Sequence, residues 1–127
     1  MTSKKQIILG IDPGLADTGF GVISKEGQTL TMLDCGSIKT KPQTEFMDRL
    51  KIINFELKKI IKKHKPDIAA VEELFFCKNA KTALLVGQAR GVCLLTIAEA
   101  KIEFTEFTPL QIKQAITGYG KADKNQV

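Results

Sequence analysis

Two acidic residues end two predicted apolar strands. Asp12 ends the segment 6–12, and Glu72 lies near the end of the segment 67–73, directly after four apolar residues. A carboxylate that finishes a buried strand is costly without a partner. If these strands are neighbours, about 4.8 Å apart, the two carboxylates converge at the carboxyl edge of the sheet, where open α/β folds place their sites. Converging carboxylate oxygens suit a hard cation such as magnesium.

Each acid also has a simple structural interpretation. Asp12 precedes Pro13 and Gly14, and Asp-Pro-Gly is a good turn sequence in any protein. Glu72 is equally compatible with a solvated strand end. The burial of the preceding residues favours a site, but these residues alone leave both interpretations open.

Residues further along the chain could contact a nucleic acid. Phe75 and Phe76 follow the acidic strand end, and consecutive residues there point to opposite faces. One ring could therefore stack on an unpaired base, although two core residues are the simpler interpretation. Lys113, Lys121 and Lys124 flank a glycine-rich break and could contact phosphates, although lysines of this kind are more often only solvated.

The first half of the chain predicts a meander followed by a helix. Strands at 6–12, 18–24 and 30–39 are joined by short connections. The segment 44–63 has apolar residues at three- and four-residue spacing, which predicts an amphipathic helix. We expect Thr44 as its N-cap and His64 as a solvated residue at its lysine-rich end.

The second half alternates helix and strand. After the strand at 67–73, the sequence predicts a helix at 79–100, a strand at 102–107, a helix from Pro109, and the start of another at Asp123. We expect the strand at 67–73 to be central and covered on both faces. The order β-β-β-α-β-α-β-α predicts an α/β fold with a mixed five-stranded sheet flanked by helices, in a single domain over 1–127.

The predicted helix at 79–100 is apolar nearly all round. A helix of this kind must be covered on more than one side. The sheet can cover one side, and a second subunit is a natural cover for the other, because small residues allow close approach. A core helix covered only by its own chain is the alternative. One stripe consists of Ala80, Leu84, Gly87, Gly91, Leu94 and Ala98.

Composition narrows the class of protein. The 127 residues carry a net charge of +5, which is compatible with a polyanionic partner. The three cysteines lie far apart, which argues against a disulfide framework or a zinc site. We find no apolar run that approaches the roughly 20 residues of a membrane helix and no signal-peptide core. A cytoplasmic protein without a membrane partner is therefore expected.

Four stretches of the sequence together carry a resemblance to a known family. The first runs from Ile8 to Gly14 and continues in Thr18 to Val22; the second runs from Val71 to Phe75; the third comprises Lys78 to Ala80 and Gly87 to Val92; the fourth comprises Gln111 to Gln114 and Gly118 to Val127. In these stretches the chain resembles the RuvC family of crossover junction endodeoxyribonucleases. Their order and spacing match over almost the whole chain, and the Gln-Ala-Arg-Gly stretch and the last stretch are the more specific.

The resemblance implies a homodimer of ribonuclease-H-like folds that resolves four-way Holliday junctions by paired symmetric nicks. It implies that Asp12 and Glu72 are catalytic metal ligands, that two Mg²⁺ ions are used (with Mn²⁺ as a possible substitute), and that hydrolysis follows a two-metal scheme. Phe75 matches a junction-contacting aromatic, and Lys113 and Lys124 match phosphate-contacting lysines. The helix at 79–100 resembles the family's dimer helix. Branch-migration motor proteins are the implied partners.

One departure from the family concerns the end of the sequence. The resemblance implies two further acidic or histidine ligands from a helix near the C-terminus, and this sequence stops before such a helix. We therefore expect a C-terminally truncated domain that cuts slowly or not at all.

Three alternatives stay open at this point. They are a non-cleaving junction-binding or DNA-binding module on the same fold, an RNA-processing nuclease of a related family, and a phosphotransferase of the actin and sugar-kinase class. The last would need a second nucleotide-binding lobe, for which 127 residues are too few.

Overall fold

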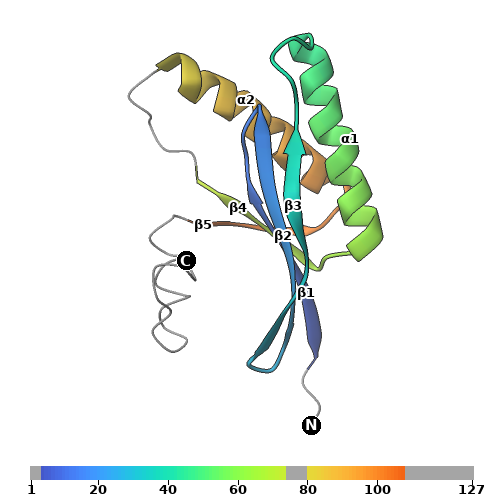
Figure 1. Cartoon of the computed structure of the whole chain (residues 1–127). Helices are drawn as coiled ribbons and strands as arrows, with labels where there is room; N and C mark the ends of the chain where they lie inside the picture. The colour runs from blue at the N-terminus through green and yellow to red at the C-terminus, as the bar shows by residue number, and fades with distance from the viewer. Residues whose placement is uncertain (1–3, 74–79, 108–127) are drawn as a thin grey trace.

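A computed structural model describes residues 4–73 and 80–107 of the chain (Figure 1). The expected helices from Pro109 and from Asp123 lie outside these residues. Every strand and helix predicted within them is present, with ends shifted by one or two residues. The elements are β1 (Lys5–Asp12), β2 (Asp17–Glu26), β3 (Thr29–Lys39), α1 (Phe46–His64), β4 (Ile68–Glu72), α2 (Ala80–Glu99) and β5 (Glu103–Phe107).

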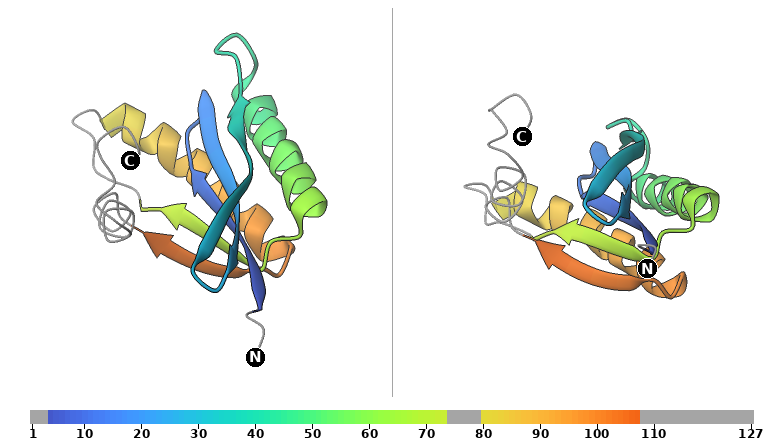
Figure 2. Two further views of the ribbon diagram at one scale, coloured as in Figure 1. Left: turned by 60° about the horizontal axis from the view of Figure 1, so that its bottom comes forward. Right: turned by 90° about the horizontal axis from the view of Figure 1, so that it is seen from below.

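The strands form one mixed sheet in the order β3-β2-β1-β4-β5. The pairs β1–β2 and β2–β3 are antiparallel, whereas β4 is parallel to both β1 and β5. In both views of Figure 2, β5 forms one edge of the sheet and α1 lies near the other edge, beside β3. The predicted combination of an antiparallel meander with parallel strands is confirmed, and β1 and β4 are neighbours.

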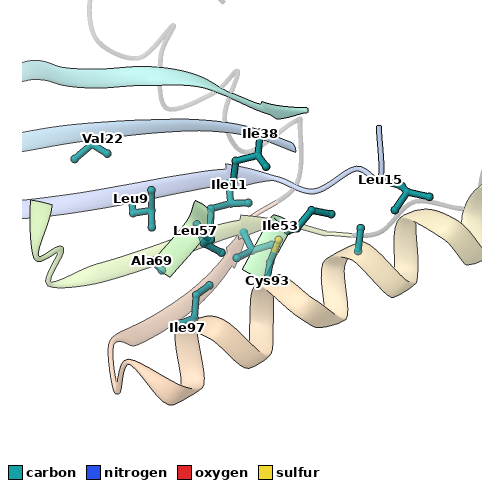
Figure 3. Packing of buried hydrophobic residues seen from close by; sticks show 12 residues of the cluster. Leu9, Ile11, Leu15, Val22, Ile38, Ile53, Leu57, Ala69, Cys93 and Ile97 are labelled. Atoms are coloured by element: carbon teal, nitrogen blue, oxygen red, sulfur yellow. The ribbon is translucent and has the colours of Figure 1, made fainter. Parts of the chain in front are cut away.

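The core lies between one face of the sheet and the two helices. Alternate residues of the strands point toward α1 and α2, and the two helices also contact each other. Figure 3 shows these side chains converging in one layer. The fully buried members of this layer are Leu9, Ile11, Val22, Ala69 and Val71 of the sheet, Ile53 and Leu57 of α1, and Ala89, Cys93 and Ile97 of α2.

The opposite face of the sheet is less covered among the described residues. In β4, Ala69 and Val71 are buried, but Ile68, Ala70 and Glu72 are only partly buried. The expectation that both faces of this strand are covered is therefore not met within 4–73 and 80–107. The unbroken apolar run suggested two buried faces, yet two of its residues point to a face where neither α1 nor α2 packs.

Two local expectations for α1 are wrong. The helix begins at Phe46, and its cap residue Glu45 makes no side-chain capping bond. Thr44 lies in a preceding turn, where its backbone N–H donates to the carbonyl of Lys41 at 3.0 Å. At the other end His64 is not solvated: its side chain is 12% exposed, and Nε2 lies 2.9 Å from Oδ2 of Asp34 in β3. His64 follows Leu57 by seven residues and shares its inward face, so tertiary packing overrides the terminal position.

Helix α2 is long and apolar enough to cross a membrane by length and composition, in contrast to the expectation that no segment approaches this length. Its inner side accounts for part of this apolar character, because Ala89, Cys93 and Ile97 pack in the core. On its outer side Leu84 and Leu95 are 69% and 59% exposed. A Cβ added to Gly91, between them, would meet nothing within 4 Å. The two apolar sides predicted for this helix are therefore present.

Truncation of Leu57 should destabilise the fold much more than truncation of an exposed residue on the same helix. Leu57 is fully buried, whereas Met47 is 71% exposed. We expect Leu57→Ala to lower the free energy of unfolding by about 2–5 kcal/mol, because it leaves a cavity. Met47→Ala should change it by less than about 0.5 kcal/mol. Urea unfolding followed by circular dichroism measures both, and equal losses would place the core elsewhere.

Candidate functional site

Asp12 and Glu72 lie at the ends of neighbouring parallel strands. The pairing of β1 with β4 matches Ile11 with Val71, and each acid is the next residue. Because side chains alternate along a strand, and because Ile11 and Val71 point into the core, both carboxylates point to the opposite face. The structure therefore brings together the two acids that the sequence singled out, while their role as metal ligands stays a prediction.

The loop after Asp12 is held by hydrogen bonds from Thr18 and Thr40. Buried Thr18 donates from its hydroxyl to the carbonyl of Gly14 at 2.6 Å. Thr40 donates in the same way to the carbonyl of Leu15 at 2.6 Å, and Arg49 Nε donates to the Thr40 hydroxyl at 2.8 Å. These bonds fix the backbone at the point where β1 ends. They therefore restrict where the Asp12 carboxylate can lie.

Gly14 is required by the shape of this loop. A Cβ at this position would lie 2.4 Å from the carbonyl oxygen of Asp17. Since that atom belongs to the backbone, a side chain could be accepted only if the loop moved. The Asp-Pro-Gly sequence is therefore a turn, as its simple interpretation proposed, and the same turn also presents Asp12.

The two carboxylates interact strongly. Partial burial, followed by a hydrogen bond with Asp12 and the charge of that residue, raises the pKa of Glu72 to about 7. Glu72 thus holds a proton that it would ordinarily lose near pH 4.5. A divalent cation bound by the carboxylate oxygens would offset their repulsion with its two positive charges. Their donor chemistry fits Mg²⁺ or Mn²⁺, which prefer oxygen ligands.

Within the described ranges, no group of three or more acidic, histidine or cysteine side chains could hold a metal ion. In this part of the chain, the carboxylates brought together at the strand ends are the two of Asp12 and Glu72. Phe75, Lys113 and Lys124, which were predicted to contact DNA, lie outside the described residues.

A cleft of about 800 Å³ lies on the open face of the sheet, with both carboxylates in its wall. Gly10 of β1 and two glycines of β2, Gly19 and Gly21, line this wall with backbone in place of side chains. A ligand can therefore approach the sheet closely beside the acids. The described lining residues are Ile8, Gly10, Ile11, Asp12, Gly19, Phe20, Gly21, Ile23, Ala70, Glu72, Thr105, Glu106 and Phe107.

Sequence reasoning gave no role to Arg90, which lies directly behind the site. Its Nε donates to the backbone carbonyl of Glu72 at 3.3 Å, and its Nη2 lies 3.3 Å from Oε1 of Glu106. Its place in the Gln-Ala-Arg-Gly stretch was the one available signal. That stretch indicated a protein family, but it did not predict which atoms the guanidinium contacts.

Comparisons with known proteins agree on one family. The family model for the crossover junction endodeoxyribonuclease RuvC matches residues 8–127. The RuvC of Halothermothrix orenii is 54% identical over 121 residues, covering 95% of this chain and 73% of that protein. The RuvC of Ruminiclostridium cellulolyticum is 51% identical over the same length, with the same coverage.

Solved structures give the same result. The structure of Thermus thermophilus RuvC in complex with a Holliday junction substrate superposes with a TM-score of 0.87 at 33% identity, covering 96% of this chain and 74% of that one. The yeast mitochondrial Holliday junction resolvase Ydc2 superposes with a TM-score of 0.67 at 14% identity, which shows a shared fold.

Replacing Asp12 should lower the pKa of Glu72. In the metal-free protein this pKa is raised above its unfolded value near 4.5. The stability that the protonated group contributes is therefore fully present below pH 4.5 and is lost as the pH rises through about 7. In Asp12→Asn the neighbouring charge is gone, so the pKa of Glu72 in the folded protein should fall, and the loss of stability should be smaller and complete at a lower pH. A carbon-13 NMR titration of the Glu72 carboxyl group measures it.

Asp48→Asn is the matched control, because Asp48 is exposed in the first turn of α1. It should leave the titration of Glu72 unchanged. An unchanged pKa in Asp12→Asn as well would show that burial alone, and not the neighbouring carboxylate, raises it.

Proposed function

The chain belongs to the RuvC family of crossover junction endodeoxyribonucleases, and on this basis we propose that it resolves four-way DNA junctions by paired symmetric nicks. The observation that carries this proposal is the pair Asp12 and Glu72, held together at the wall of an open cleft. The similar Thermus protein was solved with a Holliday junction substrate. A four-way junction is therefore the substrate that we assign here.

Asp12 and Glu72 would hold Mg²⁺, with Mn²⁺ as a substitute and two ions as the expected number. Bound there, such ions lower the pKa of an attacking water and stabilise the leaving oxygen of a phosphodiester. The residues of the chain would bind the ions and orient the DNA. The hydrogen-bonded loop after β1 fixes Asp12, and the end of β4 carries Glu72. The glycines that line the cleft would let a DNA strand reach both carboxylates.

DNA contacts beyond the metal centre are proposed from the family resemblance. Phe75 would stack on a base near the junction centre, and Lys113 and Lys124 would contact phosphates. The net charge of +5 supports a polyanionic substrate. A cytoplasmic location and an association with branch-migration motor proteins are proposed on the same resemblance.

A homodimer would place two sites opposite one another on a nearly two-fold substrate. The outer face of α2 supports this proposal, because Leu84 and Leu95 are exposed on either side of Gly91. A helix that is apolar on a solvent-facing side is expected to have a partner. The surface lies within the helix at 79–100 that the sequence indicated.

Removing either carboxylate should abolish cutting but not binding. With Mg²⁺ and a labelled four-way junction, we expect Asp12→Asn and Glu72→Gln to lower the cleavage rate by roughly 100-fold or more, since metal affinity depends on the ligands. Junction affinity, measured by gel shift, should stay within about threefold, because phosphate contacts provide most of it. Asp48→Asn is the control and should cut at the original rate.

The same assay separates the alternatives. Paired cutting of the junction by the unmodified protein, with either Mg²⁺ or Mn²⁺, would exclude a non-cleaving DNA-binding module. Preferential cutting of structured RNA would favour the RNA-processing nuclease. Cleavage at an unchanged rate in both acidic variants would contradict the proposed site.

Charge on the outer face of α2 should dissociate the dimer. We expect Leu84→Lys combined with Leu95→Lys to convert a dimer into a monomer in sedimentation velocity, because two charges would be buried in an apolar contact. Phe55→Lys on α1 is the matched control, since Phe55 is 61% exposed on another surface. An unchanged mass in the double variant would place the interface elsewhere.

A further inference from the structure

Arg90 connects three elements directly behind the carboxylate pair. It belongs to α2, its side chain is only 15% exposed, and its guanidinium lies 3.3 Å from a carboxylate oxygen of Glu106 in β5. Its Nε donates to the backbone carbonyl of Glu72 at the end of β4. One side chain from a helix therefore contacts two adjacent strands at the edge where the site lies.

The chemistry of arginine suits this double contact. A largely buried cation is costly unless an acid is paired with it, and Glu106 supplies that acid. The guanidinium is planar with fixed donor directions, so one group can hold a carboxylate and a carbonyl together. A lysine carries a single nitrogen on a flexible stem and would not reproduce this geometry.

The end of β4 needs such support. Pairing between β1 and β4 ends at Val71, one residue before Glu72. On its other side Glu72 pairs with Phe107 of β5, and the N–H of Glu73 donates to the Phe107 carbonyl at 2.8 Å. Toward β1, however, the ladder has ended, and the bond from Arg90 restrains the same peptide from the helix side of the sheet.

We propose that Arg90, held by Glu106, is a positioning residue that fixes the backbone of Glu72 so that its carboxylate and that of Asp12 can bind a divalent cation. Metal sites need their ligands held within about 0.5 Å of the productive geometry. The inference rests on the proposed function only in taking the carboxylate pair as a cation site. It adds a residue that touches neither the cation nor the DNA.

The test measures Mn²⁺ binding without DNA, by the loss of the free Mn²⁺ signal in electron paramagnetic resonance. Arg90→Gln should weaken Mn²⁺ binding by roughly 10- to 100-fold, as expected when an outer support of a ligand is lost. Arg90→Lys should give no full rescue, because it cannot hold both partners. Glu106→Gln keeps a hydrogen-bond acceptor and should give an intermediate loss.

Thr96→Val is the matched structural control on the same helix. Thr96 is buried, and its hydroxyl donates to Asn54 Oδ1 at 2.7 Å, so the variant removes a contact between α2 and α1 far from the site. It should lower thermal stability and leave the Mn²⁺ affinity unchanged. Equal losses of affinity in Thr96→Val and Arg90→Gln would show general destabilisation and overturn the proposal.

Cleavage provides a second readout. In Arg90→Gln, raising the Mn²⁺ concentration should restore junction cutting, with the midpoint shifted by the same factor as the binding constant, while junction affinity is unchanged. Unaltered Mn²⁺ affinity in folded Arg90→Gln would overturn the proposal, as would an unmodified protein whose Mn²⁺ binding does not depend on Asp12. Asp12-dependent Mn²⁺ binding that Arg90→Gln weakens, without any junction cutting, would support the positioning role and contradict the proposed function alone.

Discussion

The repulsion between two carboxylates is the constraint on which the rest of this structure depends. Partial burial, together with the adjacent Asp12 carboxylate, raises the pKa of Glu72 to about 7. The backbones that carry both carboxylates are fixed. The fixing is done by the parallel pairing of β1 with β4 and by the buried residues that precede each acid. The stability of the hydrophobic layer therefore holds together a pair that is unfavourable without a cation or a shared proton.

The backbones of Asp12 and Glu72 are supported in different ways. Asp12 is followed by a loop that Thr18, Thr40 and Arg49 hold through hydrogen bonds of 2.6–2.8 Å. Glu72 has β5 on one side and the guanidinium of Arg90 behind it. All of this support comes from the edge of the sheet or from its helix side. The opposite face is consequently free of supporting side chains from α1 and α2, and the cleft opens there.

The sequence predicted the elements and the acids well, because both depend on local pattern. Apolar runs and their spacing identify strands and helices, and an acid at the end of such a run is conspicuous. Whether Asp12 and Glu72 point to the same face depends on register, which no local pattern contains. The same limit explains the error at His64, which contacts Asp34 in β3, whereas at Thr44 a local turn from Lys41 takes the place of the helix cap. Arg90 was not assigned a role because one of its partners is a backbone carbonyl 18 residues away. Every residue has such a carbonyl, so the sequence does not show which one a side chain contacts.

Helix α2 joins the site to the proposed dimer surface. Arg90 and Gly91 are consecutive, yet one contacts the end of β4 and the other lies on the open outer side of the helix. A subunit packed over Leu84 and Leu95 would restrain the same turns of α2 that carry the guanidinium. Rigid helices transmit small displacements because packed interiors do not deform continuously. In the proposed dimer, the contact between subunits and the support of the Glu72 backbone would therefore share one structural element.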